Sequence, residues 1–307
     1  MQILILLCIL IGIFAFLLLT VSYIVFRMAI CTKGHKFNLK KDKPAKKQKT
    51  LSVAQYEWFE QAQEVSVHTK DNLLLTGYEI SRPGDKWVIV VHGYSGSVVN
   101  MLTYIDWFYK HDYNVLAINL RGHGTSQGKY YGLGLLDGDD ISIWAKYISD
   151  KHLNPQITLF GLSMGAASCL TSAANHSCLY TNVISDSAPS SFCTMFIRIL
   201  CHKMGRLGRL IVPMLSMWTK LFAGYSLYDA STEKAVSRIT CPVLYIHGAS
   251  DGFVPPEMMH LLYDKTCSSK KKLLIDGAEH THAVDVAPDS YWNCIYDFLA
   301  QHGGMIQ

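Results

Sequence analysis

The sequence predicts an α/β domain, built on a mostly parallel sheet with helices on both faces, behind an N-terminal transmembrane helix. Short apolar runs alternate with helix-like stretches, and the later runs are continuously aliphatic, as in strands buried on both faces. The first residues form one long apolar segment. The 307 residues are 50% hydrophobic and 17% charged, which excludes a disordered chain and leaves enough sequence after the apolar segment for one such domain.

The apolar segment runs from Ile3 to Phe26 and predicts a transmembrane helix over residues 1–28. At 1.5 Å per residue it reaches about 36 Å, enough to cross a hydrocarbon core with some tilt. A cleaved signal peptide is the alternative, but it requires a basic start and a shorter core that ends in small residues. Here Met1-Gln2 carries no basic side chain, and bulky residues close the run before Arg27.

A basic juxtamembrane linker is predicted over residues 29–50. Nine Lys and Arg lie between Arg27 and Lys49 against one acid, Asp42. The positive-inside rule therefore places the following domain in the cytoplasm, and the same lysines could lie against anionic headgroups or form a solvated linker that only sets topology. Without this net +8, the total of +4 becomes −4 for the rest of the chain, which argues against a nucleic-acid-binding domain.

The nine cysteines argue against a disulfide framework or a zinc site. Their number is odd and no C-x-x-C pair occurs. Free thiols suit a reducing compartment, in agreement with the charge asymmetry.

Residues 51–307 are expected to form the domain. The predicted strands are Glu64–Thr69, Leu73–Ile80, Trp87–Val91, Val115–Asn119, Ile157–Phe160, Val183–Ser185, Val243–His247 and Lys272–Ile275. The predicted helices are Val98–Lys110, Gly138–Lys151, Met164–Asn175, Pro256–Thr266 and Ala287–Gln301. Asp137 is expected to cap the second of these helices, and Pro256 suits a first helical turn.

A helical lid is predicted at about 190–228. This stretch lies between two core strands, contains no clear strand, and is rich in Met, Leu, Ile and basic residues. An ordinary crossover helix is the alternative, but the stretch is long for a simple connection.

Gly161-Leu162-Ser163-Met164-Gly165 is the sharpest local motif. A G-x-S-x-G sequence between a strand and a helix is typical of a strained turn that exposes a nucleophilic serine, with glycines where the turn must pack tightly. A serine hydroxyl needs a base, and the base needs an acid that orients it.

The acid and the base are expected after later strands, in the order Ser, acid, His. Asp251 follows the strand at 243–247, although it could also be a turn or N-cap residue before Pro255. His280 follows the strand at 272–275, and His282 is the second choice for the base. A metal site on this histidine pair has no supporting carboxylate–histidine framework.

Acyl transfer also requires donors for the developing oxyanion. The strand at 87–91 leads into His92-Gly93-Tyr94-Ser95-Gly96, and the backbone N–H groups of Tyr94 and Met164 are the expected pair. The alternative for His92-Gly93 is a simple tight turn.

With these motifs in this order, residues 64–298 resemble the α/β-hydrolase superfamily. The resemblance rests on the H-G-x-x-G loop, Asn119-Leu120-Arg121-Gly122-His123-Gly124-Thr125-Ser126, the G-x-S-x-G turn, His247-Gly248…Asp251 and Gly277…His280. More narrowly, the sequence looks like serine-aminopeptidase-like (S33/S9-type) and lysophospholipase-like hydrolases, particularly bacterial membrane-anchored ones. Ala223-Gly224-Tyr225-Ser226…Asp229-Ala230-Ser231 adds to that narrower likeness.

The resemblance implies an α/β-hydrolase fold, a Ser163–Asp251–His280 triad, and a structural role for the loop from Arg121 to Ser126. Ala166 stands where many members carry a second glycine, a small change. No metal or organic cofactor is implied. The lid and the anchor vary within the family and are expected to set substrate choice.

The expected activity is cleavage of an ester, thioester or amide through an acyl-Ser163 intermediate. The expected substrate is a small-molecule or lipid ester; neither a nucleic acid nor an obligate protein partner is inferred. A catalytically silent, membrane-tethered interaction module and an acyltransferase are the alternatives.

Overall fold

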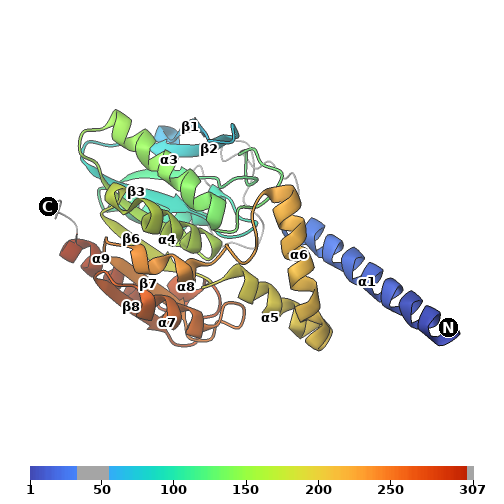
Figure 1. Cartoon of the computed structure of the whole chain (residues 1–307). Helices are drawn as coiled ribbons and strands as arrows, with labels where there is room; N and C mark the ends of the chain where they lie inside the picture. Colours follow the sequence, from blue (N-terminus) through green and yellow to red (C-terminus); the bar gives the residue numbers. More distant parts are fainter. Residues whose placement is uncertain (33–54, 303–307) are drawn as a thin grey trace.

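The computed structural model of the chain describes residues 1–32 and 55–302. The predicted linker at 29–50 lies outside the described residues from position 33 onward. One helix in the described part, α1, is long and apolar enough to cross a membrane. In Figure 1 it projects from a layered α/β domain.

The domain is built on one eight-stranded sheet in the order β1-β2-β4-β3-β5-β6-β7-β8. Its strands are β1 Gln63–His68, β2 Leu74–Ile80, β3 Lys86–Val91, β4 Asn114–Ile118, β5 Gln156–Leu162, β6 Asn182–Asp186, β7 Val243–Gly248 and β8 Lys270–Ile275. All eight predicted strands are present. β1 and β2 pair antiparallel, β2 also pairs antiparallel with β4, and the ladder from β4 to β8 is parallel.

Helices cover both faces of this sheet. The helices of the described residues, including the projecting α1, are α1 Gln2–Ala29, α2 Leu102–Lys110, α3 Leu135–Lys151, α4 Met164–His176, α5 Phe192–Met204, α6 Gly208–Ala223, α7 Pro256–Lys265, α8 Ala283–Val286 and α9 Pro288–His302. Short 3-10 turns stand at Phe59–Gln61, Val98–Met101, Ser177–Leu179, Gly205–Leu207, Thr232–Lys234 and Val236–Arg238.

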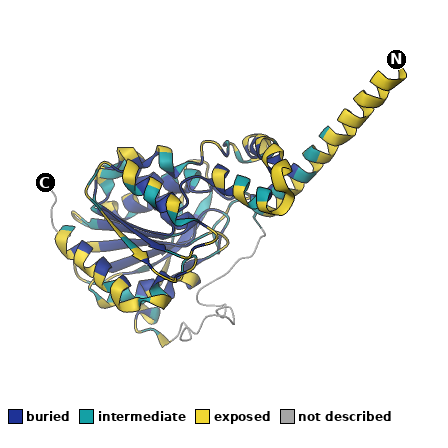
Figure 2. Ribbon diagram, turned by 90° about the horizontal axis from the view of Figure 1, so that it is seen from below, coloured by how far each residue is buried: buried dark blue, intermediate teal, exposed yellow. Residues whose placement is uncertain are grey.

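Alternate side chains of each central strand enter two separate cores. In β3, Trp87, Ile89 and Val91 pack with the side of α3 and α4, whereas Val88 and Val90 pack with the side of α2 and α9. Side chains on both faces are therefore apolar, which explains the continuous aliphatic runs. Figure 2 shows this sheet as the buried centre of the domain.

The start of α3 corrects one expectation. Asp137 is not the N-cap: α3 begins earlier, at Leu135, and its N-cap is Gly134 in the left-handed region at φ 77°. Asp137 lies inside the first turn, where its Oδ2 accepts a hydrogen bond from the Gly134 N–H at 2.9 Å. Because glycine has no side chain to cap the helix, the Asp137 carboxyl group three residues later accepts the hydrogen bond at the helix start.

The predicted lid range contains two helices, α5 and α6, between β6 and β7. The end of α1 packs against them and against the domain. Trp218 of α6 donates a hydrogen bond from Nε1 to Ser22 Oγ at 2.9 Å. Phe26 and Ile30 are 2% and 0% exposed and belong to one of the two cores, so the last turns of α1 are part of the packed structure.

Candidate active site

Ser163 lies at the sharp turn between β5 and α4, with φ 55° and ψ −115°. This positive φ is costly for a residue with a side chain and marks a strained turn. The Ser163 N–H donates to the carbonyl of Asp186 at 2.8 Å, which ties the turn to the end of β6. The strand–turn–helix context predicted for the motif is present.

The two glycines of the motif are required by close packing. A Cβ on Gly161 would lie 2.4 Å from the Gly165 oxygen, and a Cβ on Gly165 would lie 2.4 Å from the carbonyl oxygens of His92 and Val91. Both distances are far below van der Waals contact. The motif therefore permits the turn by letting three backbone segments approach one another.

The structure brings Ser163, His280 and Asp251 together. The Ser163 Oγ lies 2.9 Å from Nε2 of His280. Nδ1 of the same ring lies 2.6 Å from Oδ2 of Asp251. An ionised carboxylate only accepts hydrogen bonds, so Nδ1 carries the proton and Nε2 is left to accept from the serine hydroxyl.

Asp251 is held as a carboxylate by a full set of donors. Burial opposes ionisation, but hydrogen bonds from His247 and His280 and from the Val254 N–H outweigh it and hold the pKa of Asp251 well below its usual range. Oδ1 accepts from the backbone N–H groups of Phe253 and Val254 at 2.9 and 2.8 Å. This acid is thus suited to orient His280 and to stabilise its cationic form.

His247 also lies at the candidate site, next to Asp251, a position that was not predicted from the sequence. It is fully buried at the end of β7, with Nε2 2.9 Å from the Val254 carbonyl and 3.3 Å from Oδ2 of Asp251. It therefore shares the Asp251 oxygen that faces His280. Its position four residues before Asp251 was visible in the sequence, but the direction of its ring was not.

His282, the second choice for the base, lies at the rim. Its Nδ1 is 2.8 Å from Oδ2 of Asp285, and both side chains are largely exposed. It makes no hydrogen bond to Ser163 among the described residues. The structure thus brings His280, and not His282, to the serine.

The predicted oxyanion loop follows β3 directly. A Gly96 N–H to Gly93 carbonyl bond of 3.1 Å closes a tight turn, and Ser95 adopts φ 57°. Within the described chain, the structure gives no hydrogen-bond acceptor to the backbone N–H of Tyr94 or of Met164. The role of these two amides as oxyanion donors stays a prediction.

His92 fixes the base of this loop. It is completely buried, its Nε2 accepts from the Leu120 N–H at 3.1 Å, and its Nδ1 lies 2.8 Å from the Gly93 carbonyl. Burial, with His123 beside it, lowers the pKa of His92 to about 3, so the ring is neutral at physiological pH. His92 thus connects the loop to Leu120, just after the end of β4.

A cavity of about 790 Å³ opens over the serine. Apolar and aromatic side chains of Tyr94, Leu162 and Phe253 line it together with Ser163 and His280. The Phe253 ring stands edge-on to His280, with centroids 5.1 Å apart. Its size and lining suit a small-molecule ligand with an apolar part.

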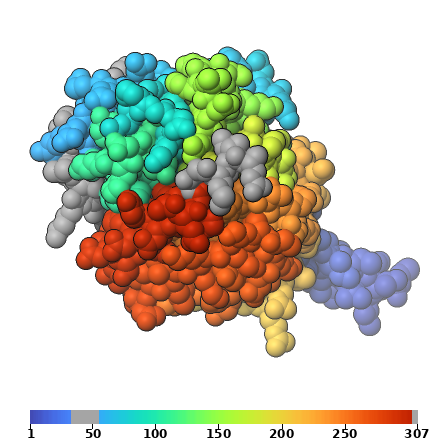
Figure 3. All heavy atoms as spheres, turned by 90° about the vertical axis from the view of Figure 1, so that its left-hand side faces the viewer, coloured from blue at the N-terminus to red at the C-terminus, as the bar shows by residue number. Residues whose placement is uncertain are grey.

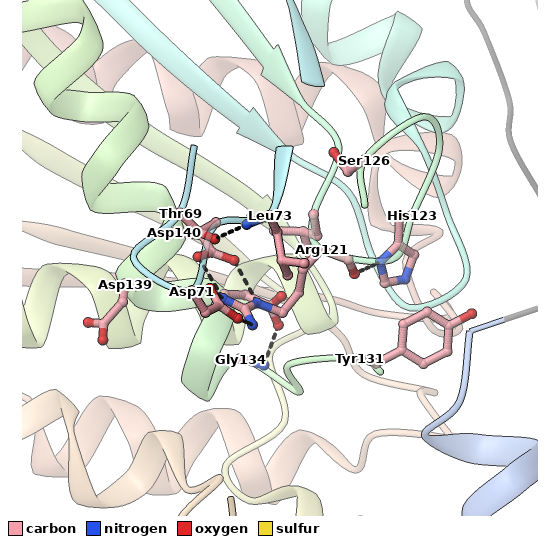
Figure 4. A network of polar contacts seen from close by, with 12 residues as sticks. Thr69, Asp71, Leu73, Arg121, His123, Ser126, Tyr131, Gly134, Asp139 and Asp140 are labelled. Atoms are coloured by element: carbon pink, nitrogen blue, oxygen red, sulfur yellow. Dashed lines mark hydrogen bonds and ion pairs between the residues drawn. The ribbon is translucent and has the colours of Figure 1, made fainter. Parts of the chain in front are cut away.

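The Arg121–Ser126 loop carries an ion-pair network beside the site. Arg121 pairs with Asp140 through Nε at 2.7 Å and NH2 at 2.8 Å, and with Asp71 at 3.1 Å. Figure 4 shows its guanidinium between these two carboxylates. Burial opposes the charge, but the pair with Asp140 dominates and holds the pKa of Arg121 above its usual range. These ion pairs tie Arg121 to Asp71, just before β2, and to Asp140 in α3. The structural role expected for the loop stays a prediction.

No group of three or more His, Cys, Asp or Glu in the described part of the chain could hold a metal ion. The described cysteines are all free.

Comparisons with known proteins agree with this fold. A family model described as serine aminopeptidase, S33, matches residues 82–222. The Bacillus subtilis protein YqkD is 27% identical over 232 residues, covering 73% of this chain and 75% of its own length. The Saccharomyces cerevisiae membrane protein YNL320W is 25% identical over 243 residues, covering 78% and 80%.

Solved structures show the same architecture. The Pyrococcus furiosus esterase Pf2001 superposes with a TM-score of 0.69 at 24% identity, covering 86% of this chain and 100% of the esterase. A puromycin-hydrolyzing peptidase of Mycobacterium tuberculosis gives a TM-score of 0.65 at 16% identity, covering 80% of this chain and 39% of the peptidase. The sheet order, the site at the strand ends and these matches together show that this chain has the α/β-hydrolase fold, and residues 82–222 match the serine aminopeptidase family model.

Proposed function

We propose that the chain is a membrane-anchored serine hydrolase that cleaves a carboxylic ester, thioester or amide through an acyl-Ser163 intermediate. The observation that carries the proposal is the continuous hydrogen-bond chain from Ser163 Oγ through His280 to Asp251. A nucleophile bonded to a base, and the base to an orienting acid, is the arrangement that activates a serine hydroxyl.

The proposed reaction follows from this geometry. As Ser163 Oγ attacks the acyl carbon, Nε2 of His280 takes the hydroxyl proton and then delivers it to the leaving group. The N–H groups of Tyr94 and Met164 donate to the oxyanion in both tetrahedral intermediates. Water, deprotonated by His280, then releases the acyl group and restores the Ser163 hydroxyl.

We propose an ester with an apolar acyl part as the substrate class. The cavity presents Tyr94, Leu162 and Phe253 to the serine. Asp285 is the only carboxylate among the described residues that line it, and it is paired with His282. The described lining thus offers no unpaired carboxylate to a substrate α-ammonium group, which favours an acyl ester over an aminoacyl peptide.

We propose that α1 spans the membrane and that the domain lies in the cytoplasm. The lysines and arginines at 27–49 lie on the C-terminal side of the apolar run, which supports this orientation. Two reporters fused after His302 test the orientation, one that works only in the cytoplasm and one that works only outside it. We expect a signal from the cytoplasmic reporter. A signal from the other reporter instead would contradict the orientation.

The catalytic proposal is tested by labelling the full-length protein, in a mild detergent, with a fluorophosphonate probe that reacts with activated serines. The full chain is needed because Phe26 and Ile30 are packed in the domain. We expect wild type to label, Ser163→Ala not to label, and His280→Ala to label at least about 100-fold more slowly.

His282→Ala is the matched control, because it removes a histidine two residues away that does not contact the serine. Its labelling rate should stay within about twofold of wild type. Folded wild type that does not label, or labelling that survives Ser163→Ala, would refute the proposed nucleophile. If wild type labels, a panel of esters of increasing acyl length then tests the substrate class.

A further inference from the structure

The lid helices α5 and α6 carry apolar side chains that are exposed. On α6, Leu210, Met217 and Leu221 are 46%, 45% and 66% exposed. Spacings of seven and four residues place them on one face of the helix. The opposite face, with Ile211, Val212, Leu215 and Thr219, is buried. The α5–α6 turn continues the exposed set with Met204 and Leu207 at 38% and 52%. We call these five exposed residues and the basic ones beside them the lid surface.

The lid surface is purely basic. Between residues 190 and 228 the chain has Arg198, Lys203, Arg206, Arg209 and Lys220, and no Asp or Glu. All five are exposed, and three of them lie on or next to the α5–α6 turn. An apolar stripe with cations along its edge is the composition of a helix that lies in the headgroup region of an anionic bilayer.

The lid is also fixed to the membrane helix. Tyr23 packs edge-on to Trp218, with centroids 5.3 Å apart, and Phe26 lies 5.5 Å from Phe222. Leu18, Val21 and Val25 pack on a cluster formed by Cys193, Leu200, Ile211 and Val212 of the lid. Contact between α1 and the lid therefore extends from Phe26 back to Leu18.

This contact sets the depth of the lid. Arg27 is the first charged residue of the chain and marks the end of the apolar run. From Arg27 back to Leu18 the helix axis measures about 13 Å. Lid residues that pack on Leu18 thus lie deeper along the axis of α1 than Arg27, on the side of the apolar run. Figure 1 shows α5 and α6 next to α1 at the edge of the domain, and in Figure 3 a tip of this region projects from the body of the molecule.

We propose that the lid surface docks in the headgroup layer of the leaflet that faces the domain, with its apolar residues in the acyl boundary and Lys203, Arg206 and Arg209 on anionic phospholipids. The inference rests on α1 being the membrane span of the proposed function. It makes the lid a second membrane contact, continuous with the first.

The docked lid is connected to the catalytic acid. On α5, Met195 and Ile199 pack against Val254 and Met258, and Arg198 donates to the Gly252 carbonyl at 3.2 Å. These residues flank the loop that follows Asp251. On the oxyanion side, the Tyr94 hydroxyl donates to the Ala29 carbonyl at the end of α1 at 3.0 Å. Both sides of the cavity are thus attached to elements that touch the bilayer, which suits a substrate taken from the membrane.

The test is amide hydrogen exchange of the full-length protein in nanodiscs that hold one chain each. One set contains phosphatidylcholine only, and the other contains phosphatidylcholine and phosphatidylserine at 7:3. We expect amides 203–209 to exchange about tenfold more slowly in the anionic set. Amides 266–269, in the turn after α7, should not change between the two sets.

Two charge variants complete the test. Arg206→Gln with Arg209→Gln should abolish the difference between the two lipid sets. Lys86→Gln with Lys146→Gln, which removes two exposed charges elsewhere on the domain, should leave it intact. Exchange of 203–209 that is fast in both sets, or equally slow in both, would overturn the proposal, as would protection that appears only when two chains share one disc.

Repeating the measurement on Ser163→Ala separates the two proposals. Lid protection reports lipid contact whether or not the serine is activated. A chain with a protected lid that does not label would refute the hydrolase proposal alone. A chain that labels with an unprotected lid would refute the docking proposal alone.

Discussion

Replacing Phe26 by alanine should destabilise the α/β domain even though Phe26 belongs to α1, the proposed membrane span. The side chain is 2% exposed, and its ring lies 5.8 Å from Tyr130 and 5.5 Å from Phe222. Truncating a buried Phe to Ala costs roughly 3–5 kcal/mol in protein cores. We take about 3 kcal/mol, since Phe26 sits where a helix docks and the gap can partly collapse.

For a domain of this size, 1 kcal/mol lowers the melting temperature by roughly 2–4 °C. The Phe26→Ala protein should therefore melt about 6–12 °C below wild type, since 3 kcal/mol is lost. The assay is thermal unfolding in a mild detergent, followed by tryptophan fluorescence. Fluorophosphonate labelling after brief heating gives an independent measure of the folded fraction.

Phe14→Ala is the matched control. Phe14 is the same residue type on the same helix, but it is 47% exposed. It should melt within about 2 °C of wild type. If Phe26→Ala and Phe14→Ala melt together, α1 is an anchor that merely touches the domain, and the reasoning that its last turns belong to the core is refuted.

Three further outcomes are expected. His247→Gln should lower the rate of fluorophosphonate labelling of the folded protein roughly tenfold, because the ring nitrogen that lies between the Val254 carbonyl and Asp251 Oδ2 is lost and the loop that holds Asp251 is loosened. A labelling rate equal to wild type would remove His247 from the site. Gly165→Ala should cost about 3 kcal/mol or more by urea unfolding, since the new Cβ lies 2.4 Å from two carbonyl oxygens, whereas Gly252→Ala, with open space around it, should cost much less. Burial, with Asp140 nearby, raises the pKa of Asp137 to about 7. Between about pH 4 and 7 the folded chain therefore holds a proton that the unfolded chain has lost, and the free energy of unfolding falls as the pH rises. Asp137→Asn should accordingly match wild type near pH 4 and exceed it by up to about 4 kcal/mol at pH 8 in urea unfolding; a difference that does not vary with pH would contradict this.

The order of strands and helices could be predicted because each is encoded locally. Continuous aliphatic runs such as Val88–Val91 predict strands buried on both faces, and all eight predicted strands are in the sheet. The α3 boundary was predicted less well. Its true cap, Gly134, has no side-chain signal, and Asp137 has the chemistry of a cap while serving from inside the first turn.

The residues of the candidate site were also available from sequence, because in a parallel sheet the ends of strands converge on one edge. Ser163, Asp251 and His280 each follow a strand, and their order along the chain matched a known arrangement. The position of the His247 ring beside Asp251 could not be predicted from the sequence. Hydrogen-bond direction depends on ring orientation and on the fold of the 251–254 loop, neither of which leaves a periodic trace in the sequence.

From local composition and motifs we could predict a long apolar helix, followed by an α/β domain that carries a candidate nucleophile turn, an acid and a histidine in order. How that helix meets the lid depends on contacts that only the folded chain makes. A helix that is apolar on every side carries no polar stripe that would indicate which face packs. The face with Ser22, Phe26 and Ile30 was selected by the shape and the Trp218 donor of a segment nearly two hundred residues away. Contacts between distant segments arise from three-dimensional complementarity, and local composition does not encode them.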